Sequence, residues 1–183
     1  MADNFPQILT KRLLLRQIVQ ADVQHVFEGL SHPDVIRYYG VSYSTLEATQ
    51  EQMDWFRKIW EEGTGTWWGI CFRDRPDELL GACGFNNWSQ KHNHAEIGYW
   101  LLPPYQRKGI MSEAIPAIMQ HAYNEMHLHR ITAIVEPENI GSIWLLEKMG
   151  FAQEGLFKDA EYKNGKYIDI LQYAIISPND RSI

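Results

Sequence analysis

Hydrophobic and polar positions along the chain follow two periods, one close to two residues and one close to 3.6. Short apolar runs bounded by turn residues predict strands at 8–18, 66–72, 78–85, 94–102, 130–136, about 150–157 and 167–176. Apolar residues three and four positions apart predict helices at 21–30, 33–39, 46–61, 109–126 and between Asn139 and Gly150. This order predicts an α+β fold, in which one mixed sheet of about seven strands is flanked by helices.

Local signals mark where several of these elements begin and end. Ser44 to Glu47 reads Ser-Thr-Leu-Glu, the form of a capping box at the start of a helix. Asn139 is a favourable N-cap, and Gly150 is a favourable stop for the helix between them. Asn164-Gly165 predicts a tight hairpin turn between the last two strands.

The segment "LLPPYQRKGIMSEA" (101–114) places a polar, basic turn between an apolar strand and a helix. The first N–H groups of a helix have no partner within it, and the helix dipole makes that end positive, so a phosphate can bind there. Gly109 lets the backbone approach a ligand closely, and Arg107 and Lys108 add positive charge. The turn is therefore either a cradle for an anion or a solvated loop. It matches neither a P-loop nor a dinucleotide-binding fingerprint.

A family resemblance begins at this turn. The residues from Gln106 to Met111 (QRKGIM) resemble the Gln/Arg-x-x-Gly-x-Gly/Ala signature of the GNAT superfamily of acetyl-CoA-dependent N-acetyltransferases. The segment "NIGSIWLLEKMGF" (139–151) is similar to the Asn-x-x-Ser…Glu-Lys-x-Gly-Phe segment of the branch that contains the ribosomal-protein alanine N-acetyltransferases. The stretches "LTKRLLLRQI", "HAEIGYWL" and "YIDILQYAII" resemble the same branch.

The resemblance covers 8–176 as a single domain and leaves 1–7 and 177–183 as tails. The chain departs from the family pattern at two positions that bear on the site. Met111 stands where glycine or alanine is usual. Leu146 stands where many alanine N-acetyltransferases carry a tyrosine, so this helix offers no tyrosine acid.

The resemblance implies transfer of an acetyl group from acetyl-CoA to a primary amine, by direct attack in a ternary complex. It also implies a mostly antiparallel sheet that splays between its fourth and fifth strands, 94–102 and 130–136. The simplest acceptor is a protein N-terminus, because an α-amino group of pKa about 7.7–8.0 is about one-tenth neutral at pH 7. A small amine (antibiotic, polyamine or amino acid) as acceptor, and a non-catalytic acyl-CoA sensor, remain open alternatives.

The same resemblance implies which residues bind acetyl-CoA, with no metal involved. The diphosphate is expected on the basic turn and the helix start, and the thioester carbonyl on a backbone N–H of the fourth strand. The nucleotide end is expected near the helix after Asn139. The expected residues are Leu101, Leu102, Gln106, Arg107, Lys108, Gly109, Ile110, Met111, Ser112, Asn139, Ser142 and Lys148.

Four residues are candidates for the chemistry itself. Ser142 and Asn139 are expected to hydrogen-bond the departing thiolate; the alternatives are a solvated serine and a simple N-cap. Glu96 and Glu161 are candidates for the general base, directly or through water, and strand alternation decides whether Glu96 faces the site. The segment Tyr38-Tyr39-Gly40 belongs to a loop that edges the acceptor groove in this family, where it either grips the acceptor or packs internally.

Charge and cysteine content narrow the range of partners. A net charge of −6 and a pI of about 5.6 argue against a nucleic-acid partner, which normally needs a basic face. Cys71 and Cys83 lie in apolar strand-like runs and are expected to be reduced core thiols of a cytoplasmic protein. The start of the chain lacks the apolar region of a signal peptide, and no run has the length of a membrane span. We therefore expect no membrane partner, and either a monomer or a homodimer.

Overall fold

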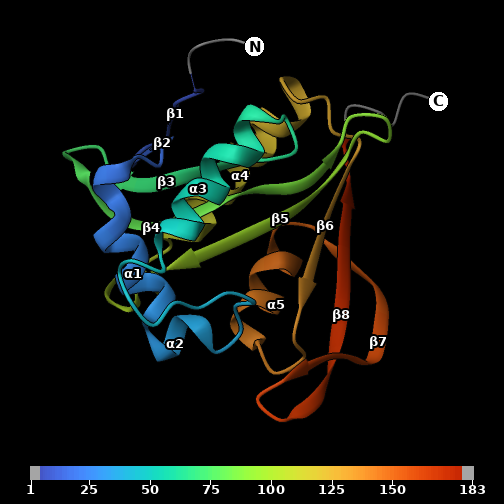
Figure 1. The fold of residues 1–183 in the computed structure, drawn as a ribbon. Helices are drawn as coiled ribbons and strands as arrows, with labels where there is room; N and C mark the ends of the chain where they lie inside the picture. The colour runs from blue at the N-terminus through green and yellow to red at the C-terminus, as the bar shows by residue number, and fades with distance from the viewer. Residues whose placement is uncertain (1–4, 179–183) are drawn as a thin grey trace.

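The computed structural model describes residues 5–178, which form an eight-stranded sheet with helices on both faces (Figure 1). The strands are β1 (Ile8–Leu9), β2 (Leu13–Gln17), β3 (Thr66–Phe72), β4 (Arg75–Ser89), β5 (His94–Leu101), β6 (Arg130–Val135), β7 (Ala152–Lys163) and β8 (Lys166–Ile176). Their order across the sheet is β1-β2-β3-β4-β5-β6-β8-β7, and each neighbouring pair is antiparallel except β5 with β6. The predicted α+β fold is confirmed, with one strand more than expected.

Two hydrophobic cores cover the two faces of the sheet. One contains buried residues of α1 (Val23–Ser31), α2 (Pro33–Ile36) and α3 (Gln50–Glu61), which pack with Trp67. The other contains buried residues of α4 (Ile110–Asn124) and α5 (Ile140–Lys148), which pack with Trp68. Trp67 and Trp68 are neighbours on β3 and enter opposite cores, as the alternation of a strand requires.

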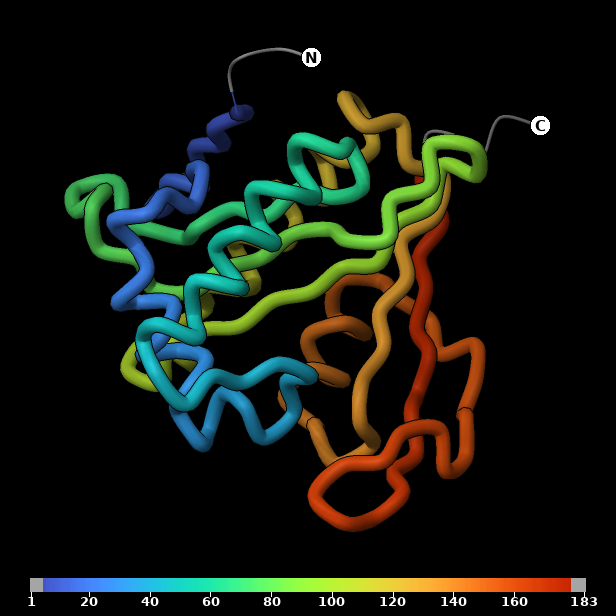
Figure 2. The backbone as a smooth tube through the Cα atoms, viewed as in Figure 1, coloured from blue at the N-terminus to red at the C-terminus, as the bar shows by residue number. Residues whose placement is uncertain are grey.

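The sheet divides between β5 and β6. These strands pair at only three positions, His94 with Arg130, Ala95 with Ile131 and Glu96 with Thr132. Beyond them β5 continues beside β4, whereas β6 diverges together with β8, as Figures 1 and 2 show. The edge of β5 beyond Glu96 therefore faces a gap, and the predicted splay between the fourth and fifth predicted strands is confirmed.

The N-terminal part of the chain differs from the prediction. The run 8–18 forms two strands instead of one, because Thr10 and Leu13 close a turn: the Thr10 N–H donates to Leu13 O, and the Leu13 N–H donates to Thr10 Oγ1, both at 3.0 Å. Pro6, assigned to a tail, packs on the domain, since its carbonyl accepts from Trp68 Nε1 at 2.7 Å. Residues 1–4 and 179–183 of the predicted tails lie outside the described part of the chain.

Helix α3 starts at Gln50, four residues later than predicted. The capping box assigned to Ser44 is wrong, because the Thr45 hydroxyl accepts the Ala48 N–H at 3.1 Å and closes a separate turn before the helix. Strand β7 is longer than predicted, since it pairs with β8 as far as Lys163, next to the hairpin turn.

The predicted ends of the last helix and hairpin are confirmed. Asn139 caps α5, with its Oδ1 accepting the Ser142 N–H at 3.2 Å. Gly150, with φ of +90°, follows the end of α5 in the left-handed conformation. Asn164 and Gly165 also have positive φ (+51° and +81°), as a tight hairpin turn requires.

The two cysteines lie in the cores, as expected. Cys71 and Cys83 are both free and buried, and burial raises the pKa of the Cys71 thiol to about 11. Within residues 5–178, no helix combines the length and the apolar character that crossing a membrane requires.

Candidate active site

The predicted anion-binding turn connects β5 to α4 and follows a short 3-10 helix, η2 (Pro103–Tyr105). Arg107 and Gly109 have φ of +58° and +73°, so the chain reverses here through the left-handed region. Gly109 is the N-cap of α4, and no side chain caps this helix end. The N–H groups of residues 109–112 therefore have no partner within the helix and are available to a ligand.

Arg12 and Glu113 form an ion pair that contacts this turn, and we call the pair the clamp. The Arg12 guanidinium donates to Lys108 O and Gly109 O at 3.2 Å each, and its Nε donates to Glu113 Oε2 at 2.6 Å. Glu113 Oε1 also accepts from the Arg12 N–H at 2.7 Å and from the Thr10 hydroxyl at 2.6 Å. Burial alone would raise the pKa of Glu113, but these hydrogen bonds outweigh it and lower that pKa.

The Arg12 contacts also orient the amides of the turn. In a planar trans peptide, the C=O and the following N–H point in opposite directions. Since the carbonyls of Lys108 and Gly109 face Arg12, the N–H groups of Gly109 and Ile110 face the other way. The clamp of Arg12 and Glu113 thus presents these amides on the side where a ligand would bind.

A cavity of about 790 Å³ lies against the turn, and we call it the donor cavity. Ten of the predicted acetyl-CoA residues line it: Leu101, Gln106, Arg107, Gly109, Ile110, Met111, Ser112, Asn139, Ser142 and Lys148. Its wall also includes Trp144, whose side chain is 58% exposed and whose ring centre lies 4.7 Å from Lys148 Nζ. Trp144 was not predicted as a site residue, because an apolar residue at helical spacing is usually part of a core.

Two predicted residues do not line the donor cavity. The Leu102 N–H already donates to Leu80 O at 2.9 Å, so the prediction of Leu102 as a donor to the thioester carbonyl is wrong. The Lys108 ammonium lies over the ring of Tyr105, 5.8 Å from its centre, and its side chain takes no part in the cavity wall. The backbone of Lys108 nevertheless belongs to the turn that Arg12 holds.

The backbone N–H groups of β5 point alternately toward β4 and toward the gap. The Leu102 N–H donates to Leu80 O, which shows which N–H groups belong to the β4–β5 ladder. In the β4–β5 register, the N–H groups of Trp100 and Gly98 therefore also point toward β4. The N–H groups of Tyr99 and Leu101 therefore point toward the gap, where β6 has diverged. Such amides can hydrogen-bond a carbonyl placed in the gap. The Gln106 side chain secures the end of this edge, because its Nε2 donates to Leu101 O at 2.9 Å.

A second cavity, of about 800 Å³, adjoins the first, and we call it the acceptor cavity. The loop between α2 and α3 (traced in Figure 2) contributes Tyr38 to Tyr43, and α3 contributes Trp55. Strands β3 to β6, helix α5 with the segment before it, and the β7–β8 hairpin contribute the remaining walls. The predicted aromatic loop at 38–40 thus borders this cavity, beside a further aromatic side chain at Trp67.

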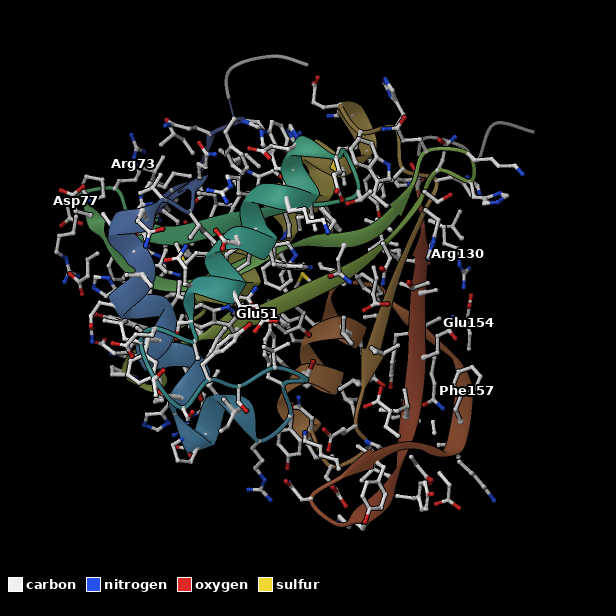
Figure 3. The ribbon with its side chains drawn as sticks, viewed as in Figure 1. Glu51, Arg73, Asp77, Arg130, Glu154 and Phe157 are labelled. Atoms are coloured by element: carbon white, nitrogen blue, oxygen red, sulfur yellow. The ribbon has the colours of Figure 1, made fainter. Side chains whose placement is uncertain are left out.

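Carboxylates are the main charged groups of the acceptor cavity. Both predicted base candidates, Glu96 and Glu161, line it, so strand alternation turns Glu96 into the site. Glu51 of α3 lines it as well and is labelled in Figure 3. Glu136 is paired with Lys163, whose ammonium also donates to Arg37 O at 2.6 Å. This contact ties the β7–β8 hairpin to the segment after α2.

The two cavities meet at five residues, which line both: Tyr38, Tyr39, Tyr99, Asn139 and Ser142. The Tyr99 hydroxyl lies 2.6 Å from Ser142 Oγ, and burial raises the pKa of Tyr99 to about 12. Asn139 Oδ1 is engaged as the cap of α5, so the N-cap role considered for it is confirmed. Tyr99 was not predicted; its place in "HAEIGYWL", beside the expected gap, was the available signal.

The two cavities together have the features that a two-substrate transfer needs. Uncapped helix amides and Arg107 suit the diphosphate of coenzyme A, and the free edge of β5 suits its extended arm. The neighbouring cavity offers carboxylates and aromatic rings to an amine. The hydroxyl of Ser142 lies where the two substrates would meet.

Comparisons with known proteins agree with this geometry. The family model "Acetyltransferase (GNAT) domain" matches residues 12–152. The N-acetyltransferase YoaA of Bacillus subtilis, whose function is uncharacterized, is 38% identical over 96% of this chain and 99% of its own. The [ribosomal protein uS5]-alanine N-acetyltransferase of Escherichia coli is 30% identical over 71% of this chain and 67% of its own.

Solved structures show the same relationship. The ribosomal L7/L12 α-N-protein acetyltransferase RimL, in complex with coenzyme A, aligns with a TM-score of 0.83 and 26% identity. That alignment covers 93% of this chain and 98% of the RimL chain. With a matching family model, related N-acetyltransferases and a donor cavity formed at the signature turn, the chain belongs to the GNAT family and is an N-acetyltransferase.

Proposed function

We propose that this GNAT N-acetyltransferase transfers the acetyl group of acetyl-CoA to the α-amino group of a protein N-terminus. The observation that carries the proposal is the junction of the donor and acceptor cavities at Tyr99, Asn139 and Ser142. An amine in one cavity and a thioester in the other can meet there without a covalent enzyme intermediate. Both cysteines are buried in the two cores, and neither lines either cavity.

The donor side follows from the backbone. GNAT acetyltransferases use acetyl-CoA, and the turn held by Arg12 and Glu113 offers its amides and Arg107 to the diphosphate. The N–H groups of Tyr99 and Leu101 face the gap and hydrogen-bond the thioester carbonyl, whose oxygen gains charge as the amine attacks. Ser142 then stabilises the sulfur as the C–S bond breaks.

The acceptor side follows from proton chemistry. The amine must attack in its neutral form, so its proton has to leave during the reaction. An α-amino group of pKa about 7.7–8.0 loses that proton far more readily than a lysine side chain of pKa about 10.4. Glu161 or Glu96 accepts the proton, directly or through water, because both carboxylates line the acceptor cavity. Tyr38 and Tyr39 line the acceptor cavity where it meets the donor cavity and contact the first residues of the peptide.

The names of two relatives support a protein acceptor. One is an E. coli enzyme acting on the alanine of ribosomal protein uS5, and the other is a ribosomal-protein-serine acetyltransferase, 36% identical over 56% of this chain. In keeping with them, we place the reaction on N-terminal alanine or serine in the cytoplasm.

The test uses acetyl-CoA with peptides that begin with alanine or serine, each with a free or a formylated N-terminus. Free-thiol release and mass spectrometry report turnover and the acetylated position. The proposal requires acetylation of the free α-amino group and none of the formylated peptide. Acetylation confined to lysine side chains would refute it. Thiol release that never exceeds the amine-free background, with acetyl-CoA binding intact, would instead indicate a sensor.

A polyamine is the second candidate acceptor, and the carboxylates Glu51, Glu96 and Glu161 favour it. Several carboxylates in one cavity attract a molecule that carries several ammonium groups. Adding spermidine as a competitor to the peptide assay decides between the two. A polyamine that is acetylated with a higher kcat/KM than the alanine peptide would make it the physiological class of acceptor.

A further inference from the structure

Tyr99 is a half-buried tyrosine at the cavity junction to which the proposed mechanism gives no side-chain role. Its side chain lines both cavities, and its hydroxyl lies 2.6 Å from Ser142 Oγ on the first turn of α5. Leu146, which stands where many alanine N-acetyltransferases carry a tyrosine, is buried in the core. Tyr99 therefore supplies the tyrosine hydroxyl that contacts Ser142.

The direction of this hydrogen bond decides what Ser142 can do. A serine hydroxyl has one proton to donate and two lone pairs to accept with. If Ser142 donates to Tyr99, it has no proton left for a ligand. If Tyr99 donates to Ser142, the serine proton is free to point into the junction. Because burial raises the pKa of Tyr99 to about 12, its hydroxyl keeps its proton throughout the physiological range and can act as the donor.

We propose that Tyr99 is a positioning residue for the leaving group: it donates to Ser142 Oγ and thereby directs the serine proton at the departing sulfur. This role rests on the acetyl transfer proposed above. The amine nitrogen forms the new C–N bond, the C–S bond breaks, and its electron pair stays on sulfur as a thiolate. The Ser142 hydroxyl donates a hydrogen bond to that thiolate, and Tyr99 polarises the hydroxyl.

The pair does not transfer its proton to the sulfur. A thiol has a pKa of about 8.5, so transfer of a proton from a tyrosine of pKa about 12 to a thiolate would be uphill by about 3.5 pKa units. The thiolate instead leaves as such and takes its proton from water, while the proton of the amine goes to the base. Tyr99 and Ser142 contribute by lowering the energy of the charged sulfur, since hydrogen bonds to a charged group are the stronger ones.

The test measures the thiol of bound coenzyme A, by the ultraviolet absorbance of its thiolate during a pH titration. On the wild-type protein, the pKa of the bound thiol should lie below that of free coenzyme A. Tyr99→Phe removes the hydroxyl and keeps the ring, and it should raise the bound thiol's pKa by about half a unit or more. The same variant should lower kcat about tenfold and change the KM for acetyl-CoA less than twofold.

Tyr173→Phe is the matched control. The Tyr173 hydroxyl also tethers α5, because it donates to Glu147 Oε1 at 3.1 Å, but Tyr173 lines neither cavity. Tyr173→Phe should leave the thiol pKa and kcat unchanged. This result would distinguish a role in orienting the Ser142 hydroxyl from a role in anchoring α5. In a Ser142→Ala background, Tyr99→Phe should add no further shift, since Tyr99 acts through the serine.

The proposal is overturned if Tyr99→Phe leaves the thiol pKa at its wild-type value, or if its shift persists in the Ser142→Ala background. Equal shifts in Tyr99→Phe and Tyr173→Phe would also overturn it. The proposed function fails separately, when the wild-type protein releases no thiol with any amine. If the wild-type protein binds no coenzyme A, both the role of Tyr99 and the proposed function are refuted.

Discussion

Replacing Arg12 with methionine tests how the turn at 106–109 is held in place for the diphosphate. The change removes the Nε bond to Glu113 and the two bonds to the carbonyls of Lys108 and Gly109. Side-chain exposures of 43% for Arg12 and 19% for Glu113 place the ion pair between the exposed and buried limits. Exposed pairs contribute about 0.2–1 kcal/mol, and each charged bond to a carbonyl somewhat more, so we expect a loss of about 1–2 kcal/mol in unfolding free energy.

The same change should weaken acetyl-CoA binding, because the amides of Gly109 and Ile110 lose the contacts that orient them. A tenfold rise in KM for acetyl-CoA corresponds to about 1.4 kcal/mol, comparable to the loss in stability. Urea denaturation measures the stability, and initial rates at varied acetyl-CoA measure KM, with calorimetry of coenzyme A as a direct check. The KM for the amine should change little.

Arg130→Met is the matched control for this prediction. Arg130 of β6 pairs with Glu154 of the edge strand β7 (Figure 3), with exposures of 29% and 43%. It lies beside His94, at the opposite end of β5 from the turn. Arg130→Met should reduce stability by a similar or smaller amount and leave the KM for acetyl-CoA unchanged. If Arg12→Met destabilises the protein but binds coenzyme A as the wild type does, the clamp is structural only, and the reasoning fails.

Three further predictions concern other parts of the site. Glu161→Gln should reduce kcat/KM about 100-fold at pH 7 and less above pH 8, where the α-amino group is already neutral; a uniform loss across a pH–rate profile would exclude a role as base. Gly109→Ala and Gly165→Ala both force a positive φ on alanine and should each cost about 1 kcal/mol by thermal unfolding, but only Gly109→Ala should raise the KM for acetyl-CoA. Trp144→Ala should change stability by less than about 0.5 kcal/mol, because the side chain is 58% exposed, and should raise the KM for acetyl-CoA about fivefold; an unchanged KM would remove Trp144 from the donor site.

The Glu113 carboxylate adds a pH dependence to the clamp. Its pKa is lowered in the folded protein, so its contribution to stability is present above the unfolded pKa of about 4.3 and is lost as the pH falls through the folded value. Acid unfolding of Arg12→Met should therefore be less steep than that of the wild type. Equal acid-unfolding curves would mean that Arg12 does not hold the Glu113 charge.

Much of the fold could be predicted from the sequence because its signals are local. Periodicity located each helix and most strands, and the caps at Asn139 and Gly150 depend on residues only a few positions apart. The turn after η2 could be located because its glycine and the helix start are adjacent in the chain, whereas its anion-binding role stays a prediction. The late start of α3 was missed, since a capping box at Ser44 and a hydroxyl at Thr45 compete within one turn.

The parts of the site that escaped prediction depend on contacts between distant positions. Arg12 and Glu113 are 101 residues apart, and Tyr99 and Ser142 are 43 apart, so neither pair leaves a pattern in the chain. The assignment of Leu102 failed for a related reason. Which amides of β5 face the gap depends on the register with β4, and a shift of one residue reverses the answer.

The short parallel seam between β5 and β6 also has an evolutionary consequence. The donor cavity is built mainly from β5, α4 and α5, whereas the outer walls of the acceptor cavity come from the 38–43 loop and the β7–β8 hairpin. Because residues 40–43 of the loop and the hairpin residues line only the acceptor cavity, substitutions there can change which amine is accepted while the acetyl donor is still bound. The same fold can in this way evolve into enzymes that acetylate different amines and use the same acetyl donor.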